Sequence, residues 1–212
     1  MLYFKAQADT GRITVGYSFY SLIFRQKYIM RWGLMRNSSK ESLADHAAEV
    51  AVVSHALALI GNRKFGKSYD PEKVALIALF HDATEVYTGD MPTPAKYFSP
   101  EMREEYARLE KDAAKTLLLK LPEEFREDYS ELLLPDLSSD SAKECHRLVK
   151  AADKLCAHIK CITEEQSGNR EFASALTSTK KALEGLDCPE LDYFIENYLD
   201  SFRMTLDELQ SF

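Results

Sequence analysis

The stretch that decides the fold runs from residue 42 to residue 63 and reads SLADHAAEVAVVSHALALIGNR. Its apolar side chains recur at a spacing of three and four residues, which is typical of a helix with a buried face. These side chains are Leu43, Ala47, Val50, Val53, Ala56 and Leu59. Gly61 and Asn62 then offer a stop. The pattern predicts a buried helix, and this helix carries His46.

A second buried helix is predicted from Pro71 to Val86, because proline is favourable in a first helical turn and residues 74–80 read VALIALF. This apolar run leads directly into His81 and Asp82. A charged carboxylate at such a position needs a compensating partner, and metal coordination supplies one.

The rest of the chain also favours helices. We expect them at residues 100–119, 122–133, 141–165, 169–183 and 189–209. The segment from Asp90 to Pro94 reads DMPTP and is expected to be an ordered loop, because each proline lacks an amide donor and restricts the preceding residue. With no alternating strand and no linker, the sequence predicts one all-α domain over residues 17–212 and leaves 1–16 unassigned.

Composition limits the possible partners. A hydrophobic content of 45% and a charged content of 29% are typical of a soluble globular protein. The net charge of -7 opposes binding to a nucleic acid polymer but allows a small phosphate ester. The most apolar stretch, Ala47 to Gly61, is too short to span a bilayer, and the four cysteines show no paired CxxC spacing. We therefore expect a cytoplasmic protein with free thiols.

Four side chains form a candidate metal site: His46, His81, Asp82 and Asp153. Two imidazoles and two carboxylates on separate helical segments are a plausible ligand set for a divalent transition metal. The alternative for Asp153 is an ordinary ion pair with a neighbouring lysine of its helix. The whole set is a stronger signal than a lone His-Asp pair.

Helical spacing adds Glu85 to the candidate site and excludes His55 from it. Residues four apart share a helix face, so Glu85 is expected beside His81 as the group that orients or deprotonates a water molecule. The alternative for Glu85 is a hydrogen-bonding partner of a ligand, or a salt bridge. His55 is nine residues after His46 and should point away from it, as a core histidine.

These residues resemble the signature of the HD-domain metal-dependent phosphohydrolases. His46 is similar to the first histidine of that signature, His81 and Asp82 to the pair that names the family, and Asp153 to its final aspartate. The chain resembles still more closely the bacterial 5′-deoxynucleotidases of the YfbR-like kind, from about Ser18 to near the C-terminus. The motifs that carry this likeness are RWGLMR at 31–36, SLADH at 42–46, HDATEV at 81–86 and TGDMPTP at 88–94.

The resemblance implies a helical HD domain that hydrolyses deoxyribonucleoside 5′-monophosphates. We expect Glu85 and Arg31 to be its catalytic residues. The resemblance also implies that His46, His81, Asp82 and Asp153 hold the metal, and that Arg31 orients the phosphate. The residues expected at the substrate are Arg31, Trp32, His46, Asp82, Asp90, Met91, Pro92, Thr93 and Asp153. Trp32, the only tryptophan, would stand beside the sugar; its alternative is a core aromatic, and the alternative for Asp90 is a turn residue.

Mixed imidazole and carboxylate ligands favour cobalt or manganese, with zinc, nickel and iron also allowed. The resemblance further implies a homodimer, and the aromatic C-terminal segment is expected either to form the interface or to pack on the core. Two alternatives remain for the function: an HD-fold phosphohydrolase of another nucleotide, and a non-catalytic helical module that senses nucleotides or binds a partner.

Overall fold

Helices make up the regular structure of the molecule. The computed structural model describes residues 16–96 and 98–211, and every named element in them is an α-helix or a short 3-10 helix. The all-α prediction is therefore confirmed for this part of the chain. The unassigned segment 1–16 lies, apart from residue 16, outside the described residues.

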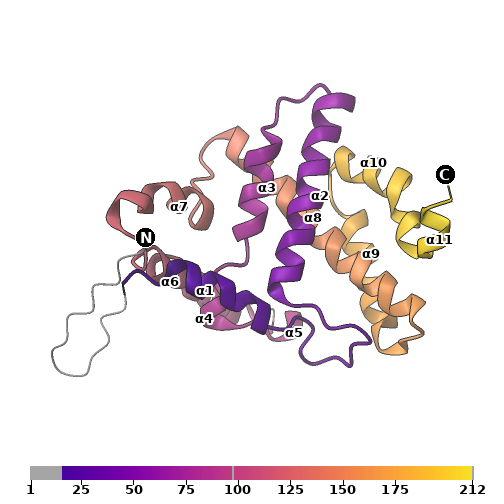
Figure 1. The fold of residues 1–212 in the computed structure, drawn as a ribbon, viewed down its shortest axis with the longest axis horizontal. Helices are drawn as coiled ribbons and strands as arrows, with labels where there is room; N and C mark the ends of the chain where they lie inside the picture. The colour runs from indigo at the N-terminus through magenta and orange to yellow at the C-terminus, as the bar shows by residue number, and fades with distance from the viewer. Residues whose placement is uncertain (1–15, 97, 212) are drawn as a thin grey trace, which may run out of the picture.

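The centre of the molecule consists of three helices, α2 (Leu43–Lys64), α3 (Pro71–Phe80) and α8 (Asp140–Gln166). In Figure 1, α2 and α3 lie side by side and α8 crosses behind them. Their buried aliphatic side chains form a shared core that includes Val50, Val53, Leu57, Val74, Ile77, Leu148, Val149 and Leu155. Each such side chain contributes roughly 1.5–3 kcal/mol when fully buried. This core sets the relative positions of the three candidate ligand-bearing segments.

The start of α2 is determined by its cap. The Ser42 hydroxyl accepts a hydrogen bond from the Asp45 amide, and the Asp45 carboxylate accepts one from the Ser42 amide. This reciprocal capping box satisfies two amides that the first helical turn leaves free. Because His46 follows Asp45 directly, the cap also sets the direction in which the His46 side chain points.

The helix predicted from Pro71 to Val86 is wrong in its second half. α3 ends at Phe80, residues 81–84 form turns, and a separate short helix, α4, spans Glu85–Thr88. The expectation that Glu85 shares a helical face with His81 therefore fails, because no continuous helix joins them.

A side chain accounts for this break. The carbonyl of Ala78 accepts the ring Nδ1–H of His81 at 2.7 Å and the backbone amide of His81 at 3.3 Å. The next amides also bond to the carbonyl three residues back, as Ala83 does with Phe80. Hydrogen bonds to the carbonyl three residues back form 3-10-type turns. An α-helix requires bonds to the carbonyl four residues back, so it ends here.

The segment after α4 is partly a loop and partly a helix. Gly89 ends α4 with a φ of 71°, a conformation that glycine adopts without steric cost. The helix α5 then spans Thr93–Lys96, so the prediction that Thr93 and Pro94 are non-helical is wrong. Proline is tolerated there because an amide in the first helical turn needs no partner within the helix.

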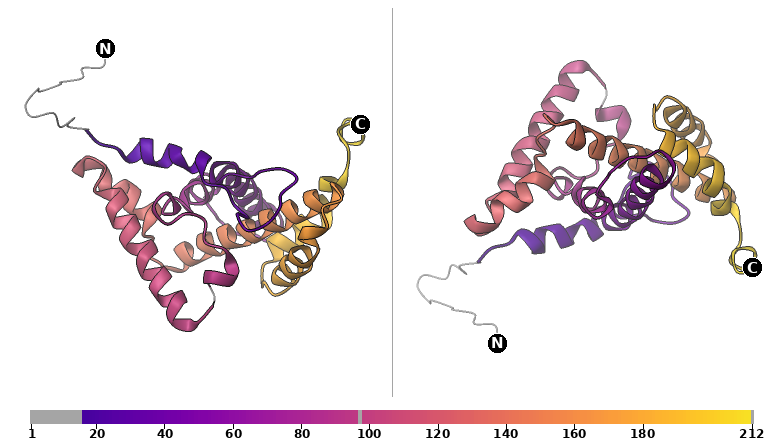
Figure 2. Two further views of the ribbon diagram at one scale, coloured as in Figure 1. Left: turned by 90° about the horizontal axis from the view of Figure 1, so that it is seen from below. Right: turned by 90° about the horizontal axis from the view of Figure 1, so that it is seen from above.

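The remaining elements flank the central helices. α6 (Pro100–Leu118) and α7 (Arg126–Leu133) lie to one side, while α9 (Ala173–Glu184) and the C-terminal helices lie to the other (Figure 2). The shorter elements are α1 (Phe19–Ile23), η1 (Phe24–Tyr28), η2 (Glu123–Phe125) and η3 (Arg170–Phe172).

The single C-terminal helix predicted over 189–209 is wrong, because the segment forms three pieces. They are α10 (Pro189–Tyr198), η4 (Leu199–Arg203) and α11 (Leu206–Leu209). Thr205 caps α11 in an extended conformation, which no helix can continue through. Of the aromatic segment, Leu191 and Phe194 pack in the core, whereas Tyr198 and Phe202 remain exposed.

The four cysteines are free and buried, in agreement with the prediction from their spacing. Within the described residues, α2 has the length and apolar composition of a membrane-spanning helix, a test that core helices also pass. Half of its most apolar window is buried inside the molecule.

Candidate functional site

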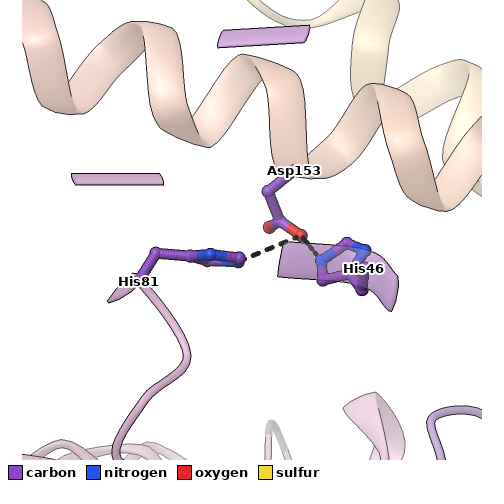
Figure 3. Close-up of side chains that lie close together, drawn as sticks. All are labelled: His46, His81 and Asp153. Carbon is purple, nitrogen blue, oxygen red and sulfur yellow. Dashed lines mark hydrogen bonds and ion pairs between the residues drawn. The ribbon is translucent and has the colours of Figure 1, made fainter. Parts of the chain in front are cut away.

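Three of the four predicted ligands meet at one point. His46 comes from α2, His81 from the turn after α3, and Asp153 from the middle of α8 (Figure 3). One ligand atom of each lies within 4.8 Å of the other two. Asp153 Oδ1 lies 3.0 Å from His46 Nε2 and 4.0 Å from His81 Nε2. Residues separated by more than a hundred positions are thus brought together by the packing of the central helices.

Both imidazoles direct Nε2 toward this point. His81 Nδ1 donates to the Ala78 carbonyl, so in the neutral ring Nε2 carries the free electron pair. His46 Nδ1 lies 3.2 Å from a carboxylate oxygen of Glu41, which leaves its Nε2 facing Asp153. Histidine ligands of metal ions are usually oriented by such a bond from the other ring nitrogen. The buried Nε2 of His81 faces two carboxylates, Asp82 Oδ2 at 3.2 Å and Asp153 Oδ1 at 4.0 Å, which fits a site built for a cation.

Asp82, the fourth predicted ligand, lies beside this triad. Its Oδ2 is 3.2 Å from His81 Nε2 and 3.5 Å from Arg31 Nη1. Burial opposes ionisation of Asp82, but the nearby His81, His46 and Arg31 hold its pKa well below the usual range. The carboxylate is therefore charged and available to a cation at the triad.

Arg31 reaches the same place from the segment before α2. Its side chain is only 12% exposed, and its Nε lies 3.0 Å from Glu41 Oε1. Burial would favour the neutral form, yet the carboxylates of Glu41, Asp153, Asp82 and Asp90 raise its pKa, so the guanidinium is charged. A planar cation at this position is suited to hold phosphate oxygens next to the triad.

Trp32 adopts a strained backbone with a φ of 58°, the one positive φ outside glycine in the described part of the chain. This conformation costs roughly 1–3 kcal/mol for an ordinary residue. Its amide donates to Asp90 Oδ2 at 3.2 Å and its Nε1 to Glu41 Oε2 at 3.1 Å. The indole also packs at 5.3 Å from the ring of Phe172. Contacts with Asp90, Glu41 and Phe172 therefore hold Trp32 in place despite its strained backbone.

The loop that bears Trp32 is anchored on α8. Glu164 is 1% exposed and accepts the amides of Ser38 at 2.8 Å and Ser39 at 3.2 Å. Burial would raise the pKa of Glu164, but bonds from Lys160, Asn169 and these amides lower it to about 2. The charged Glu164 therefore holds the loop without touching the triad.

Glu85 is buried near the triad without being part of it. Burial first, and then the negative charges of Asp82 and Asp90, raise the pKa of Glu85 to about 9. Its Oε2 has no hydrogen-bond partner among the described residues. A buried carboxyl whose pKa is raised this far by its surroundings is a candidate for proton transfer.

A surface hollow of about 420 Å3 opens beside His81. Its other lining residues are Thr84, Glu110, Lys111, Leu133, Leu134 and Pro135. This volume lies in the range of small-molecule sites. The predicted nucleoside wall is not part of its lining: Met91 and Pro92 are half-buried and Thr93 is exposed. Of that wall, Asp90 is the residue that contacts Trp32.

Glu41 is a buried residue of the candidate site that the sequence predictions missed. It is buried and contacts Arg31, Trp32 and His46. No helical spacing points to Glu41, because it lies one residue before the cap of α2. The available signal is an acidic residue between the Arg-Trp pair and the first histidine.

The chain matches the family model described as 5′-deoxynucleotidase YfbR-like over residues 18–202. It is 46% identical over 191 residues to a 5′-deoxynucleotidase of Photobacterium profundum, a match that covers 90% of this chain and 97% of that protein. An HD-domain phosphohydrolase from Listeria innocua has a similar fold, with a TM-score of 0.74, 21% identity and coverage of 91% and 92%. The HD phosphohydrolase DatZ of cyanophage S-2L, solved with dA and one catalytic Zn2+ ion, gives a TM-score of 0.56 at 19% identity, covering 85% and 96%.

Proposed function

This chain belongs to the YfbR-like 5′-deoxynucleotidase family, and we propose on that premise that it hydrolyses deoxyribonucleoside 5′-monophosphates to deoxynucleoside and phosphate. The observation that carries the proposal is the position of Arg31, whose Nη1 lies 3.5 Å from Asp82 beside the triad. A phosphate held by Arg31 would therefore lie against the candidate metal site. Trp32, the next residue, would contact the sugar attached to that phosphate.

His46, His81 and Asp153 would hold one divalent transition metal, with Asp82 as the fourth ligand. When bound, such an ion polarises a phosphoryl oxygen and lowers the pKa of a water molecule. Cobalt or manganese is our first choice, and zinc, nickel and iron fit the same donors. The zinc in DatZ supports the choice of a transition metal.

The protein side chains have separate parts in this proposal. Arg31 neutralises charge on the phosphate and orients it. Glu85, as the ionised carboxylate that a nearby divalent cation favours, takes a proton from the attacking water. A bond forms between that water oxygen and phosphorus, the bond from phosphorus to the sugar 5′ oxygen breaks, and the leaving oxygen takes up a proton.

The direct test is phosphate release from each deoxy- and ribonucleoside monophosphate, after chelation and addition of Co, Mn, Zn or Mg. We expect turnover of the deoxy series with at least one transition metal and a return to background with chelator. Equal rates on the ribo and deoxy series would reject the substrate class, and no release with any metal would reject the activity.

Replacing Trp32 with alanine is expected to relax the sugar preference more than it lowers catalysis. A pocket that excludes a hydroxyl by bulk discriminates by about 10² at most, so up to that factor can be lost. The measurement is the ratio of kcat/KM for dAMP and AMP. Trp32→Phe is the matched control: it keeps most of the bulk but loses the Nε1 donor to Glu41. An unchanged ratio in Trp32→Ala would assign the indole to structure alone.

Metal binding should release protons. Burial favours the neutral ring of His81, but Asp82 and Asp153 raise its pKa to about 9 in the metal-free protein. His81 is therefore protonated at pH 7, and a metal must displace that proton. The metal Kd should fall about tenfold per pH unit for each proton released, and this contribution should end near pH 9. Calorimetry in two buffers of different ionisation enthalpy counts the protons; zero release would contradict the assignment of His81.

We further propose a homodimeric, cytoplasmic enzyme organised as one HD domain over residues 17–212. The exposed Tyr198 and Phe202 are available to an interface. The net charge of -7 supports a small substrate over a nucleic acid polymer.

A further inference from the structure

One buried carboxylate touches three side chains of the proposed site. Glu41 is 6% exposed. Its Oε1 lies 3.0 Å from Arg31 Nε and 3.2 Å from His46 Nδ1, and its Oε2 accepts the Trp32 Nε1–H at 3.1 Å. The candidate phosphate, metal and sugar residues thus share one anion.

The same short segment also joins these residues through the backbone. The Arg31 amide donates to the Glu41 carbonyl at 2.9 Å, and the Leu43 amide donates to the Ile29 carbonyl at 2.9 Å. An antiparallel bridge between Met30 and Ser42 lies between those bonds. The segment that carries Arg31 and Trp32 is therefore held directly against the start of α2.

Glu41 is suited to this position only as an anion. Burial opposes its ionisation, but the bonds and charges of His46, Arg31 and Trp32 outweigh burial and lower its pKa. All three neighbours offer N–H donors, and an ionised carboxylate is purely an acceptor. Glutamine has the same shape, but its amide group would place N–H donors against at least one of the three.

We propose that Glu41 is a positioning residue that couples metal binding to sugar discrimination, an inference that rests on the proposed function. Through Nδ1 it orients His46 so that Nε2 faces Asp153, and through Nε and Nε1 it sets Arg31 and Trp32. A shift of this carboxylate displaces the metal ligand, the phosphate cation and the indole together. Loss of Glu41 therefore changes metal affinity and the deoxy preference in the same variant.

The test compares Glu41→Gln with Glu164→Gln. Glu164 is a matched control, because it is a buried carboxylate that holds the same loop through Ser38 and Ser39 but contacts none of the three side chains. For each protein we would measure the Kd of Co2+ and Mn2+ by calorimetry, the ratio of kcat/KM for dAMP and AMP, and the Tm. Removing a partner that orients a metal ligand typically weakens metal affinity by about 10- to 100-fold.

We expect that loss of affinity, with a reduced dAMP to AMP ratio, in Glu41→Gln, and an unchanged metal Kd in Glu164→Gln. Equal weakening of metal binding in both variants would overturn the proposal, because loosening of the loop would then explain it. A metal Kd within twofold of the parent in Glu41→Gln would also overturn it.

If Glu41→Gln does not fold, Glu41→Asp is the second variant, because it keeps the charge but has a shorter side chain. We expect it to show a smaller loss of metal affinity and a smaller fall in the dAMP to AMP ratio. An unchanged metal Kd in Glu41→Asp would overturn the proposal. Calorimetry needs no turnover. A parent that binds metal yet releases no phosphate would therefore reject the nucleotidase function while the metal Kd still tests the link between Glu41 and His46.

Discussion

Replacing Asp153 with asparagine is expected to abolish tight metal binding and to lower kcat/KM by at least roughly 10³-fold, or about 4 kcal/mol of transition-state stabilisation. Asp153 Oδ1 lies 3.0 Å from His46 Nε2 and 4.0 Å from His81 Nε2, so it is the anion shared by both imidazoles. Asparagine removes the negative charge and offers a neutral amide in its place. The measurements are metal content after dialysis and phosphate release from dAMP.

The matched control is Asp140→Asn, the same substitution in the first turn of α8. The Asp140 side chain is 98% exposed and forms an ion pair with Lys143 on the same helix. We expect this control to keep its metal and its activity. Full metal occupancy and parent turnover in Asp153→Asn would remove the triad from the proposed function.

Replacing Glu85 with alanine is expected to lower kcat by about 10² or more while metal binding is retained. Glu85 lies outside the triad of ligand atoms, and burial together with Asp82 and Asp90 raises its pKa to about 9. A group with this environment can exchange a proton near neutral pH once a cation is close. The measurements are kcat at saturating metal and the metal Kd by calorimetry.

Glu85→Gln separates proton transfer from packing, because glutamine keeps the size of the side chain but does not titrate. If Glu85 transfers a proton, both variants lose activity to a similar degree. Near-parent turnover in Glu85→Gln alongside an inactive Glu85→Ala would instead assign Glu85 a packing or hydrogen-bonding part.

Much of the fold was readable from local sequence. The apolar spacing after Ser42 predicted α2, and the helices predicted to begin at Pro71 and Pro100 agree with the starts of α3 and α6. The prediction that α3 continues to Val86 failed at His81, where an imidazole bonds to a backbone carbonyl instead of pointing away. Apolar spacing contains no information about that competition.

The candidate site was readable to a similar extent. The sequence predicted the three residues of the triad as candidate metal ligands from their chemistry, and the structure brings their potential ligand atoms within 4.8 Å of one another. It also placed Arg31 and Trp32 next to the site through a family resemblance. Glu41 was not predicted because its contacts join two separate segments, the Arg31-Trp32 pair and His46 in α2, and no local pattern reveals such contacts.

By itself, the sequence determined that this chain is helical, where its long helices begin, and which side chains have the chemistry to bind a metal and a phosphate. These properties depend on neighbours within about one helical turn, so short stretches of sequence are enough to predict them. Only the tertiary structure decided that Asp153 meets His46, 107 positions earlier, and that Glu41 ties His46 to Arg31 and Trp32. Those contacts arise from the packing of whole helices, which depends on the apolar faces of all of them together.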